Sequence, residues 1–317
     1  MNKAFITGAD GFMGRHLIRK LIEKQVDVVA IVHPDSPNKH MYDNDKSITV
    51  IEASLDYMID HFNDYCDAIN SDDTGDVYDA MFYHFAWDGV NATDRNNMEV
   101  QQKNLKLCEQ AVELAKLLKV KKFLYPGSTN EYLYCGSLIN KDAIPTPSDA
   151  YGIVKISAKK TVWDKCKEYN IDFVYAVIAG TYAADRKDNN VIFYTIDSLL
   201  KHEKPSLTSL EQNWDYVHID DAVEALYLLG DSGKDGRFYA IGKGDNQPLY
   251  KYIEAIRDNI DKNLPLGIGE VPYQRDVLPM SCVDLTAIHD DTGFIPRIEF
   301  KDGIKEVINM LRNESIV

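Results

Sequence analysis

The 317-residue sequence has few cysteines and no long apolar run. Its five cysteines are odd in number and widely scattered, and no two stand in a Cys-x-x-Cys pair. This argues against both a disulfide framework and a zinc site. No stretch approaches the ~18 consecutive apolar residues that a bilayer-spanning helix requires. An apolar strand pattern begins at Lys3, too early to leave room for a signal peptide. We therefore expect a cytoplasmic protein with free thiols, no bound metal and no membrane partner.

Basic residues are also in short supply. The sequence has 35 Lys and Arg against 50 Asp and Glu, which gives a formal net charge of −15. A strongly acidic surface repels the phosphate backbone of nucleic acids, so we expect no nucleic-acid partner. Any anionic small ligand would have to be bound by a local cluster of basic side chains.

Short apolar runs alternate with longer helical patterns over the first 180 residues. The apolar runs predict strands at 3–7, 27–32, 48–52, 79–85, 121–127 and 171–179, and the amphipathic patterns predict helices at 12–24, 95–118 and 150–169. This alternation is typical of an α/β protein with a doubly wound parallel sheet. The two longest helices, 95–118 and 150–169, could pair with their mates in a second copy, so we expect a homodimer.

The first predicted strand runs directly into a glycine-rich turn and then into a helix. Glycines at three positions of this turn allow a tight bend, a close backbone approach to a pyrophosphate and close packing of the helix on the strand. The helix N-terminus presents free N–H groups and a partial positive charge to that anion. The sequence therefore predicts a dinucleotide site that includes Gly8, Asp10, Gly11, Phe12, Met13 and Gly14.

The end of the second predicted strand indicates which dinucleotide binds. An acidic residue about 20 positions beyond the turn would hydrogen-bond the ribose 2′-hydroxyl and mark NAD. Counted from Gly14, that position falls at Val32, and the nearest carboxylate, Asp35, lies beyond a proline. The side chains that could surround a 2′-phosphate instead are Arg15, His33, Ser36 and Lys39. We therefore predict a preference for NADP(H), with NAD(H) possible; for His33, Ser36 and Lys39 the alternative is a solvated loop without a ligand.

Ser128 directly follows the fifth predicted strand, on the sheet edge that faces the cofactor crevice. Tyr151 and Lys155 follow at the start of a helix, and positions i and i+4 share one helix face. A ketone that accepts a hydride needs a proton from a nearby acid, and a tyrosine with its ordinary pKa near ~10 is too weak unless a cation stabilises its phenolate. Lys155 can supply that cation, and Ser128 can hydrogen-bond the same carbonyl oxygen. We predict Tyr151, Lys155 and Ser128 as the catalytic residues.

The glycine turn, Ser128, the pair Tyr151 and Lys155, and the segment from Trp214 to Asp221 resemble the extended short-chain dehydrogenases. These form the NAD-dependent epimerase/dehydratase family that acts on nucleotide sugars, and the resemblance covers essentially the whole chain. It implies a Rossmann domain with a smaller C-terminal α/β substrate lobe, and hydride chemistry at a sugar carbon, commonly C4. We expect the dinucleotide-binding domain to comprise 1–180 with 215–242 returning to it, and the substrate lobe to comprise 181–214 and 243–317.

The same resemblance implies further contacts. Cofactor contacts are expected from Ser54, Leu55, Phe85, Ala86, Trp87, Tyr151 and Lys155, and substrate contacts from Asn91, Thr129, Asn130 and Arg275. Arg275 matches a family arginine that grips the diphosphate of a nucleotide sugar, a contact that suits the arginine fork. Two positions depart from the family pattern: Gly180 replaces an asparagine and Trp214 replaces an arginine. A nucleotide-diphosphate sugar is the expected partner, with its base undetermined.

Dehydratases of this family resemble one another in a threonine followed by an acid pair at the serine position. The matching residues in this sequence are Ser128, Thr129 and Asn130, and Glu131 lies one position late. A shift of one residue would align Thr129-Asn130-Glu131 with the dehydratase set, but the strand before it and the aromatic Tyr132 favour Ser128.

Reductase and epimerase differ in their use of the dinucleotide. Family epimerases favour NAD, whereas a reductase consumes NADPH, so the missing strand-end carboxylate favours a reductase. The stretch from Leu207 to Tyr216 also looks similar to reductases of nucleotide 4-keto-6-deoxyhexoses. We predict NADPH-dependent reduction of the C4 ketone of a nucleotide-linked 4-keto-6-deoxy sugar. The alternatives are an NAD-dependent 4-epimerase, then a 4,6-dehydratase, and, from another class, a non-catalytic dinucleotide-sensing regulator, which would not need the intact Ser/Tyr/Lys set.

Overall fold

The computed structural model describes residues 1–69, 78–91, 93–186, 190–273 and 280–314. A seven-stranded sheet forms its centre, in the order β11-β6-β5-β4-β1-β2-β3. The strands are β1 (Lys3–Thr7), β2 (Asp27–Val32), β3 (Thr49–Glu52), β4 (Tyr78–His84), β5 (Val120–Ser128), β6 (Asp172–Ile178) and β11 (Phe238–Ile241). Every neighbouring pair is parallel. The predicted doubly wound α/β fold is therefore confirmed.

Two helical layers cover the sheet because successive side chains of each strand point to opposite faces. Phe5 packs in the core cluster under the layer of α2 (Leu55–Asp60), α4 (Met98–Leu117) and α5 (Ala150–Glu168). Ala4 and Ile6 pack in the cluster on the other face, under α1 (Phe12–Glu23), α7 (Ile219–Ser232) and α9 (Thr286–Thr292). Helix α3 (Phe62–Ile69) follows α2, and short 3-10 turns occupy η1 (Lys39–Tyr42) and η2 (Thr129–Glu131).

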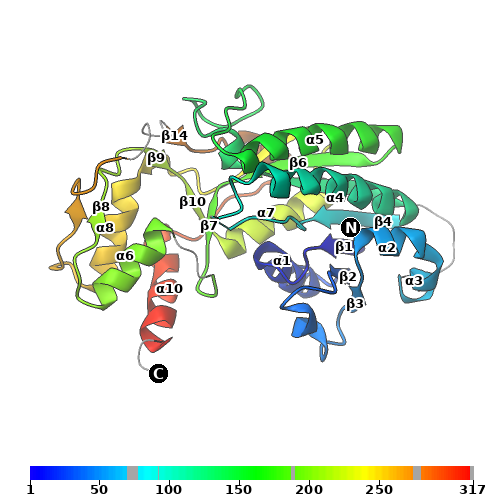
Figure 1. Cartoon of the computed structure of the whole chain (residues 1–317), viewed down its shortest axis with the longest axis horizontal. Coiled ribbons are helices and arrows are strands. Elements are labelled where there is room, and N and C mark those ends of the chain that lie inside the picture. The colour runs from blue at the N-terminus through cyan, green and yellow to red at the C-terminus, as the bar shows by residue number, and fades with distance from the viewer. Residues whose placement is uncertain (70–77, 92, 187–189, 274–279, 315–317) are drawn as a thin grey trace.

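A third core cluster lies beside the sheet, at the left in Figure 1. Its helices are α6 (Val191–Leu200), α8 (Leu249–Ile260) and α10 (Phe300–Glu314). Short strands accompany them: β7 (Gly180–Tyr182) pairs with β10 (Tyr216–His218), β9 (Asn213–Trp214) pairs with β12 (Gln247–Pro248) and β14 (Met280–Ser281), and β8 (Ser206–Leu207) pairs with β13 (Gly267–Ile268). After β6 the chain leaves the sheet and enters this region. It returns to the sheet with α7 and β11, and at α8 it enters the region again. Helix α9 falls within the predicted second lobe, yet it packs against α7 and β11.

Element boundaries follow local chemistry. Helix α4 begins at Met98 rather than near 95, because the side chain of Asn97 caps the helix and accepts hydrogen bonds from the backbone N–H groups of Glu99 and Val100. Helix α5 begins at Ala150, as predicted, because the side chain of Asp149 accepts the N–H of Gly152. Within the described ranges no helix is long and apolar enough to cross a membrane. Among those same residues no group of three or more His, Cys, Asp or Glu side chains is placed to hold a metal ion.

Candidate active site

The glycine turn joins β1 to α1 at the carboxyl edge of the sheet. Gly8 has φ +64°, and a Cβ on it would lie 2.7 Å from the backbone N of Ala86, so the turn lies directly against the end of β4. A Cβ on Gly14 would lie 2.2 Å from the carbonyl O of Gly8. Helix α1 begins at this turn without a side-chain cap and without an acidic residue in its first turn. Its N-terminal N–H groups and partial positive charge therefore suit a phosphate, and the residues fit the pyrophosphate of a dinucleotide.

The four residues predicted to surround a 2′-phosphate each lie beside a carboxylate. Lys39 Nζ is 2.8 Å from Glu52 Oε1, and the Ser36 hydroxyl donates to the buried carboxylate of Asp10. Arg15 forms an ion pair with Asp185 at 3.0 Å, and His33 Nδ1 lies 3.9 Å from Asp35 Oδ2. A phosphate dianion at this place would meet these acidic groups as well as the basic ones. The structure thus gives no support to the predicted preference for NADP(H).

Asp185 has a second contact on α1. His16, which is buried, places Nε2 3.0 Å from Asp185 Oδ1. Burial lowers the pKa of His16, and the Asp185 carboxylate opposes that shift. The segment that follows β7 is in this way attached to the helix that carries the glycine turn.

Lys155 is buried on α5, directly behind the end of β5. Its Nζ donates to the carbonyl O of Pro126 at 3.1 Å and lies 3.8 Å from the ring centroid of Trp87. Burial lowers the pKa of Lys155 to about 8. Trp87 is held in turn, since its Nε1 donates to Gln101 Oε1 at 2.9 Å. The structure therefore brings Trp87 and Lys155 together, and their place on the nicotinamide side stays a prediction.

Tyr151 lies in the first turn of α5, with its ring edge-on to Trp87 at a centroid distance of 5.7 Å. Burial raises the pKa of Tyr151 to about 12, whereas the nearby charge of Arg95 and a hydrogen bond with the Ser128 side chain act in the opposite direction. Lys155 Nζ is 5.7 Å from the Tyr151 ring centroid, and Arg95 Cζ is nearer, at 4.6 Å. The three predicted catalytic residues thus converge, and Arg95 joins them without having been predicted.

The segment after β5 holds the residues that were aligned with the family serine and with the acid pair of the dehydratases. Ser128 caps the turn η2, and the buried carboxylate of Glu131 reaches back to accept the N–H of Ser128 at 2.7 Å. The other oxygen of Glu131 accepts the hydroxyl of Tyr175 at 2.6 Å. Burial raises the pKa of Glu131. Thr129 is buried, and the amide of Asn130 donates to Asp149 at 3.3 Å. Ser128 hydrogen-bonds Tyr151, whereas the Glu131 carboxylate is bound in the core by the N–H of Ser128 and the hydroxyl of Tyr175.

His84, at the end of β4, is a buried group that the sequence did not single out. Its Nδ1 lies 2.8 Å from Thr7 Oγ1, and Thr7 Oγ1 also accepts the N–H of Ala86 at 3.4 Å. Burial lowers the pKa of His84 to about 3, and the charge of Lys155 acts in the same direction. His84 is consequently neutral, and its Nε2 has no hydrogen-bond partner among the described residues. This contact ties the carboxyl ends of β1 and β4 together beside the glycine turn.

The remaining predicted residues are spread more widely. Phe85 donates its N–H to Thr7 O at 3.0 Å, so it lies beside the glycine turn with Ala86. Leu55 is buried at the start of α2, and the Ser54 hydroxyl donates to Asp56 at 2.6 Å. Asn91 is exposed, and its side chain is occupied by bonds within its own loop, to Thr93 and Asp94. Arg275 lies outside the described residues.

The two departures from the family pattern have neighbours in the second region. A Cβ on Gly180 would lie 2.9 Å from the ring of Tyr216, so a larger residue there would displace that ring. Trp214 lines a cavity of about 980 Å³ between α6, β8 and β9. Aromatic and aliphatic side chains dominate its lining, among them Tyr194, Leu207 and Tyr216, with Asp197 as the charged group.

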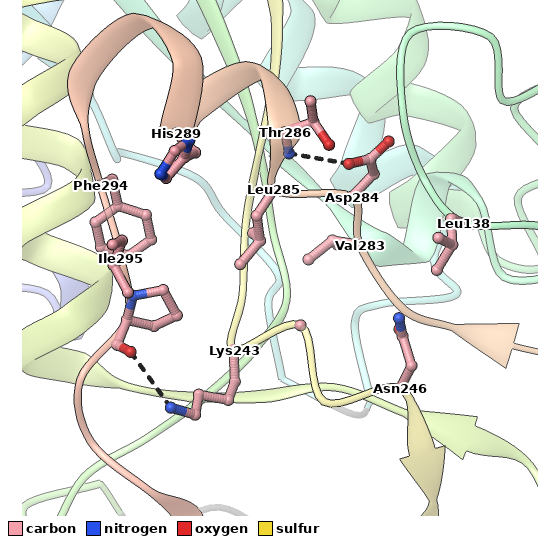
Figure 2. Close-up of a pocket in the computed structure, with 12 residues that line it drawn as sticks. Leu138, Lys243, Asn246, Val283, Asp284, Leu285, Thr286, His289, Phe294 and Ile295 are labelled. Carbon is pink, nitrogen blue, oxygen red and sulfur yellow. Dashed lines mark hydrogen bonds between the residues drawn. The ribbon is translucent and has the colours of Figure 1, made fainter.

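A second cavity, of about 480 Å³, lies between the loop after β11 and the start of α9 (Figure 2). Lys243 at its edge donates to the carbonyl O of Pro296 at 3.3 Å, and Asp284 accepts the N–H of Thr286 at 2.9 Å. None of the predicted catalytic or cofactor-binding residues lines this cavity. We therefore assign the candidate active site to the sheet edge at Tyr151.

Comparison with known proteins is in keeping with this geometry. Residues 4–242 match the family described as the NAD dependent epimerase/dehydratase family. The chain is similar to a dTDP-4-dehydro-6-deoxyglucose reductase of Escherichia coli, with 22% identity over 321 residues that cover 98% of each protein. It is similar to a dTDP-glucose 4,6-dehydratase of Haemophilus influenzae, with 21% identity over 334 residues and 97% of each covered. A solved UDP-glucuronic acid 4-epimerase from Bacillus cereus, in complex with UDP-glucuronic acid and NAD, superposes with a TM-score of 0.81 at 18% identity, covering 98% of this chain and 99% of that one.

Proposed function

The chain belongs to the NAD dependent epimerase/dehydratase family, and from that premise we propose that it reduces the C4 ketone of a nucleotide-linked 4-keto-6-deoxy sugar. As a member it is an NAD(P)-dependent enzyme of the oxidoreductase type that acts on nucleotide sugars. The observation that carries the finer proposal is the convergence of Ser128, Tyr151 and Lys155 behind Trp87, at the sheet edge that also holds the glycine turn.

Each residue has a role that its surroundings support. A bound nicotinamide dinucleotide would supply the hydride. Tyr151 donates its phenolic proton to the ketone oxygen, and Ser128 hydrogen-bonds the same oxygen. Lys155, with its pKa lowered to about 8, carries a proton at neutral pH, and its proposed role is to bind the nicotinamide ribose. Burial raises the pKa of Tyr151 and keeps the phenol protonated before the reaction, whereas the charge of Arg95 and the hydrogen bond with Ser128 favour the phenolate that forms when the proton is donated.

The position of Glu131 argues against a dehydratase. A dehydratase needs two acid–base groups that reach the substrate. In the alignment that Ser128 favours, the two positions are Thr129 and Asn130, and neither is a carboxylate. In the shifted alignment the second position is Glu131, whose carboxylate is buried and occupied by Ser128 and Tyr175. A carboxylate that braces the end of a strand cannot also abstract a proton from the sugar.

The surroundings of the proposed 2′-phosphate residues lead us to propose NAD(H), rather than NADP(H), as the tighter ligand. Asp10 beside Ser36 and Glu52 beside Lys39 place negative charge where NADP(H) would add more. The same observation favours a second candidate function, an NAD-dependent 4-epimerase, since the solved epimerase relative holds NAD. The two candidates differ in whether reduced dinucleotide is consumed.

The cavity at Trp214 is the proposed place for the nucleotide part of the substrate. Its volume of about 980 Å³ lies within the range of small-molecule sites. Trp214, Tyr194 and Tyr216 offer aromatic faces on which a base can stack.

The test is a coupled assay with purified protein. dTDP-4-keto-6-deoxyglucose and its CDP and UDP counterparts are each offered with NADH or NADPH, and the loss of reduced-nicotinamide absorbance is followed. We expect turnover with at least one sugar, and less than one thousandth of it in Tyr151→Phe. Interconversion of C4 epimers without net dinucleotide consumption would identify the epimerase instead. Absence of both activities across the panel would contradict the family-level assignment of these residues.

A further inference from the structure

Arg95 is attached to the first turn of α5 in three ways. Its carbonyl O accepts the backbone N–H of Tyr151 at 3.1 Å. Its Nε donates to Asp149 Oδ2 at 2.9 Å, and its Cζ lies 4.6 Å from the Tyr151 ring centroid. Asp149 is itself buried and fixed as the cap of α5. The guanidinium is thus held over the phenol by a residue that also defines where the helix begins.

Other charged and polar groups also face the phenol. Glu131 and Asp149 contribute negative charge, and Ser128 contributes a hydrogen bond. Lys155 lies on the same helix, but its Nζ is directed to Pro126 O and to the ring of Trp87. Its distance from the Tyr151 ring centroid, 5.7 Å, exceeds that of Arg95 Cζ. A guanidinium also keeps its charge at any pH at which the protein is folded, whereas an ammonium does not.

We propose that Arg95 is a positioning residue that holds Tyr151 at the ketone and stabilises the phenolate formed in the reaction, a role assigned from sequence to Lys155 alone. This inference rests on the proposed function. In the step concerned a bound reduced dinucleotide would supply a hydride to the ketone carbon, and the electron pair of the C=O π bond moves to the oxygen. The O–H bond of Tyr151 breaks, its proton passes to that oxygen, and the O–H electron pair stays on the phenolate beside the guanidinium. The proton is replaced from water before the next turnover.

The first experiment measures the pKa of Tyr151 in the protein alone. Fluorotyrosine is incorporated in place of tyrosine, because fluorination lowers the phenol pKa into an accessible range, and the Tyr151 fluorine resonance is identified by its loss in Tyr151→Phe. Arg95→Gln removes the charge but keeps an N–H donor for Asp149, and Arg95→Lys keeps the charge. We expect the Gln variant to raise the pKa of Tyr151 by about one unit, and the Lys variant to restore most of that change. An unchanged pKa in Arg95→Gln would overturn the proposal.

A second variant tests the same charge pair from its other side. Asp149→Asn retains the cap on Gly152, but its amide turns an N–H rather than an oxygen toward Arg95 Nε and so releases the guanidinium from its place over the phenol. Arg95→Gln should therefore shift the pKa of Tyr151 less in an Asp149→Asn background than in the wild type. Equal shifts in the two backgrounds would show that Asp149 does not hold Arg95 over the phenol and would overturn the proposal.

The kinetic readout follows from the same change. In Arg95→Gln, kcat for the reductase should drop about tenfold or more with little change in KM, and its alkaline limb should move in the direction of the titration. Because the titration needs neither substrate nor dinucleotide, a shifted pKa with no reductase activity would refute the proposed function and leave only the effect of Arg95 on the Tyr151 phenol. Reductase activity with an unshifted pKa would do the reverse.

Discussion

Asp10 lies beside the place where the 2′-phosphate of NADPH is predicted to bind. Its buried carboxylate accepts the hydroxyl of Ser36, one of the four groups first predicted to hold a 2′-phosphate. We predict that Asp10→Asn shifts the protein toward NADPH, because the amide keeps a hydrogen-bond acceptor for Ser36 and removes the negative charge.

The size of the effect follows from the distances. Two successive hydrogen bonds, from Asp10 to Ser36 and from Ser36 to a phosphate oxygen, span roughly 5 Å. Two unit charges at that separation repel by about 3 kcal/mol at an effective dielectric constant near 20, and by about 1 kcal/mol in bulk water. Asp10 is 6% exposed but Ser36 is partly open to solvent, so a value near the lower end, about 1.4 kcal/mol, is appropriate. That energy corresponds to roughly a tenfold change in affinity.

The assay is a fluorescence titration of the wild-type protein and the variant with NADH and with NADPH. The ratio of the two dissociation constants should move about tenfold toward NADPH in Asp10→Asn. Asp35→Asn is the matched control, since it removes the same charge from a side chain that is 92% exposed, and it should leave the ratio nearly unchanged. If Asp10→Asn leaves the ratio unchanged as well, the adenine ribose does not lie against Ser36 and the reasoning fails.

Three further predictions concern other parts of the molecule. Gly14→Ala should abolish dinucleotide binding and lower the free energy of unfolding by about 1–3 kcal/mol, because the new Cβ would lie 2.2 Å from the carbonyl O of Gly8. An unchanged NADH titration and an unchanged thermal unfolding curve would contradict this prediction. Below pH 6.5 His84 should make the folded wild type less stable by up to roughly 1.4 kcal/mol per pH unit, until its folded-state pKa of about 3 is reached. The reason is that His84 binds a proton in the unfolded chain but stays neutral when buried. The unfolding midpoint of His84→Gln should fall less steeply over the same pH range, and equal slopes would refute this prediction. The molar mass measured by light scattering should be twice that of one chain, and a mass equal to that of one chain would show that the predicted homodimer is wrong.

Much of the fold was predictable because each element carries a local signal. The strands of the sheet are short apolar runs, and α5 starts at its expected position because Asp149 is a good cap. The glycine turn and the pair Tyr151 and Lys155 are read from spacing along a single element. The short helices α2, α3, α8 and α9 were not predicted, since each is a few turns long and owes its stability to packing on its neighbours.

The rest of the site could not be predicted because it depends on contacts between distant segments. Arg95 lies in a loop 56 positions before Tyr151, and no local pattern indicates that this loop folds over α5. The partners of Ser36 and Lys39 are likewise set by how the loop after β2 meets the glycine turn and β3. The sequence shows which polar and basic residues are available. It does not show which carboxylate each of them contacts in the folded protein.

Glu131 has a consequence for how this chain could change its reaction. By letters alone it stands one substitution, Asn130→Asp, from the acid pair of a dehydratase. In the folded protein its carboxylate is a structural brace, held by the N–H of Ser128 and the hydroxyl of Tyr175. Acquiring dehydration through Glu131 would therefore require the core around Tyr175 to be rebuilt so that this carboxylate could be released, whereas an acid pair at Thr129 and Asn130 would leave the core as it is. In evolutionary terms, the single substitution that looks shortest in the sequence is the longer route in the folded protein.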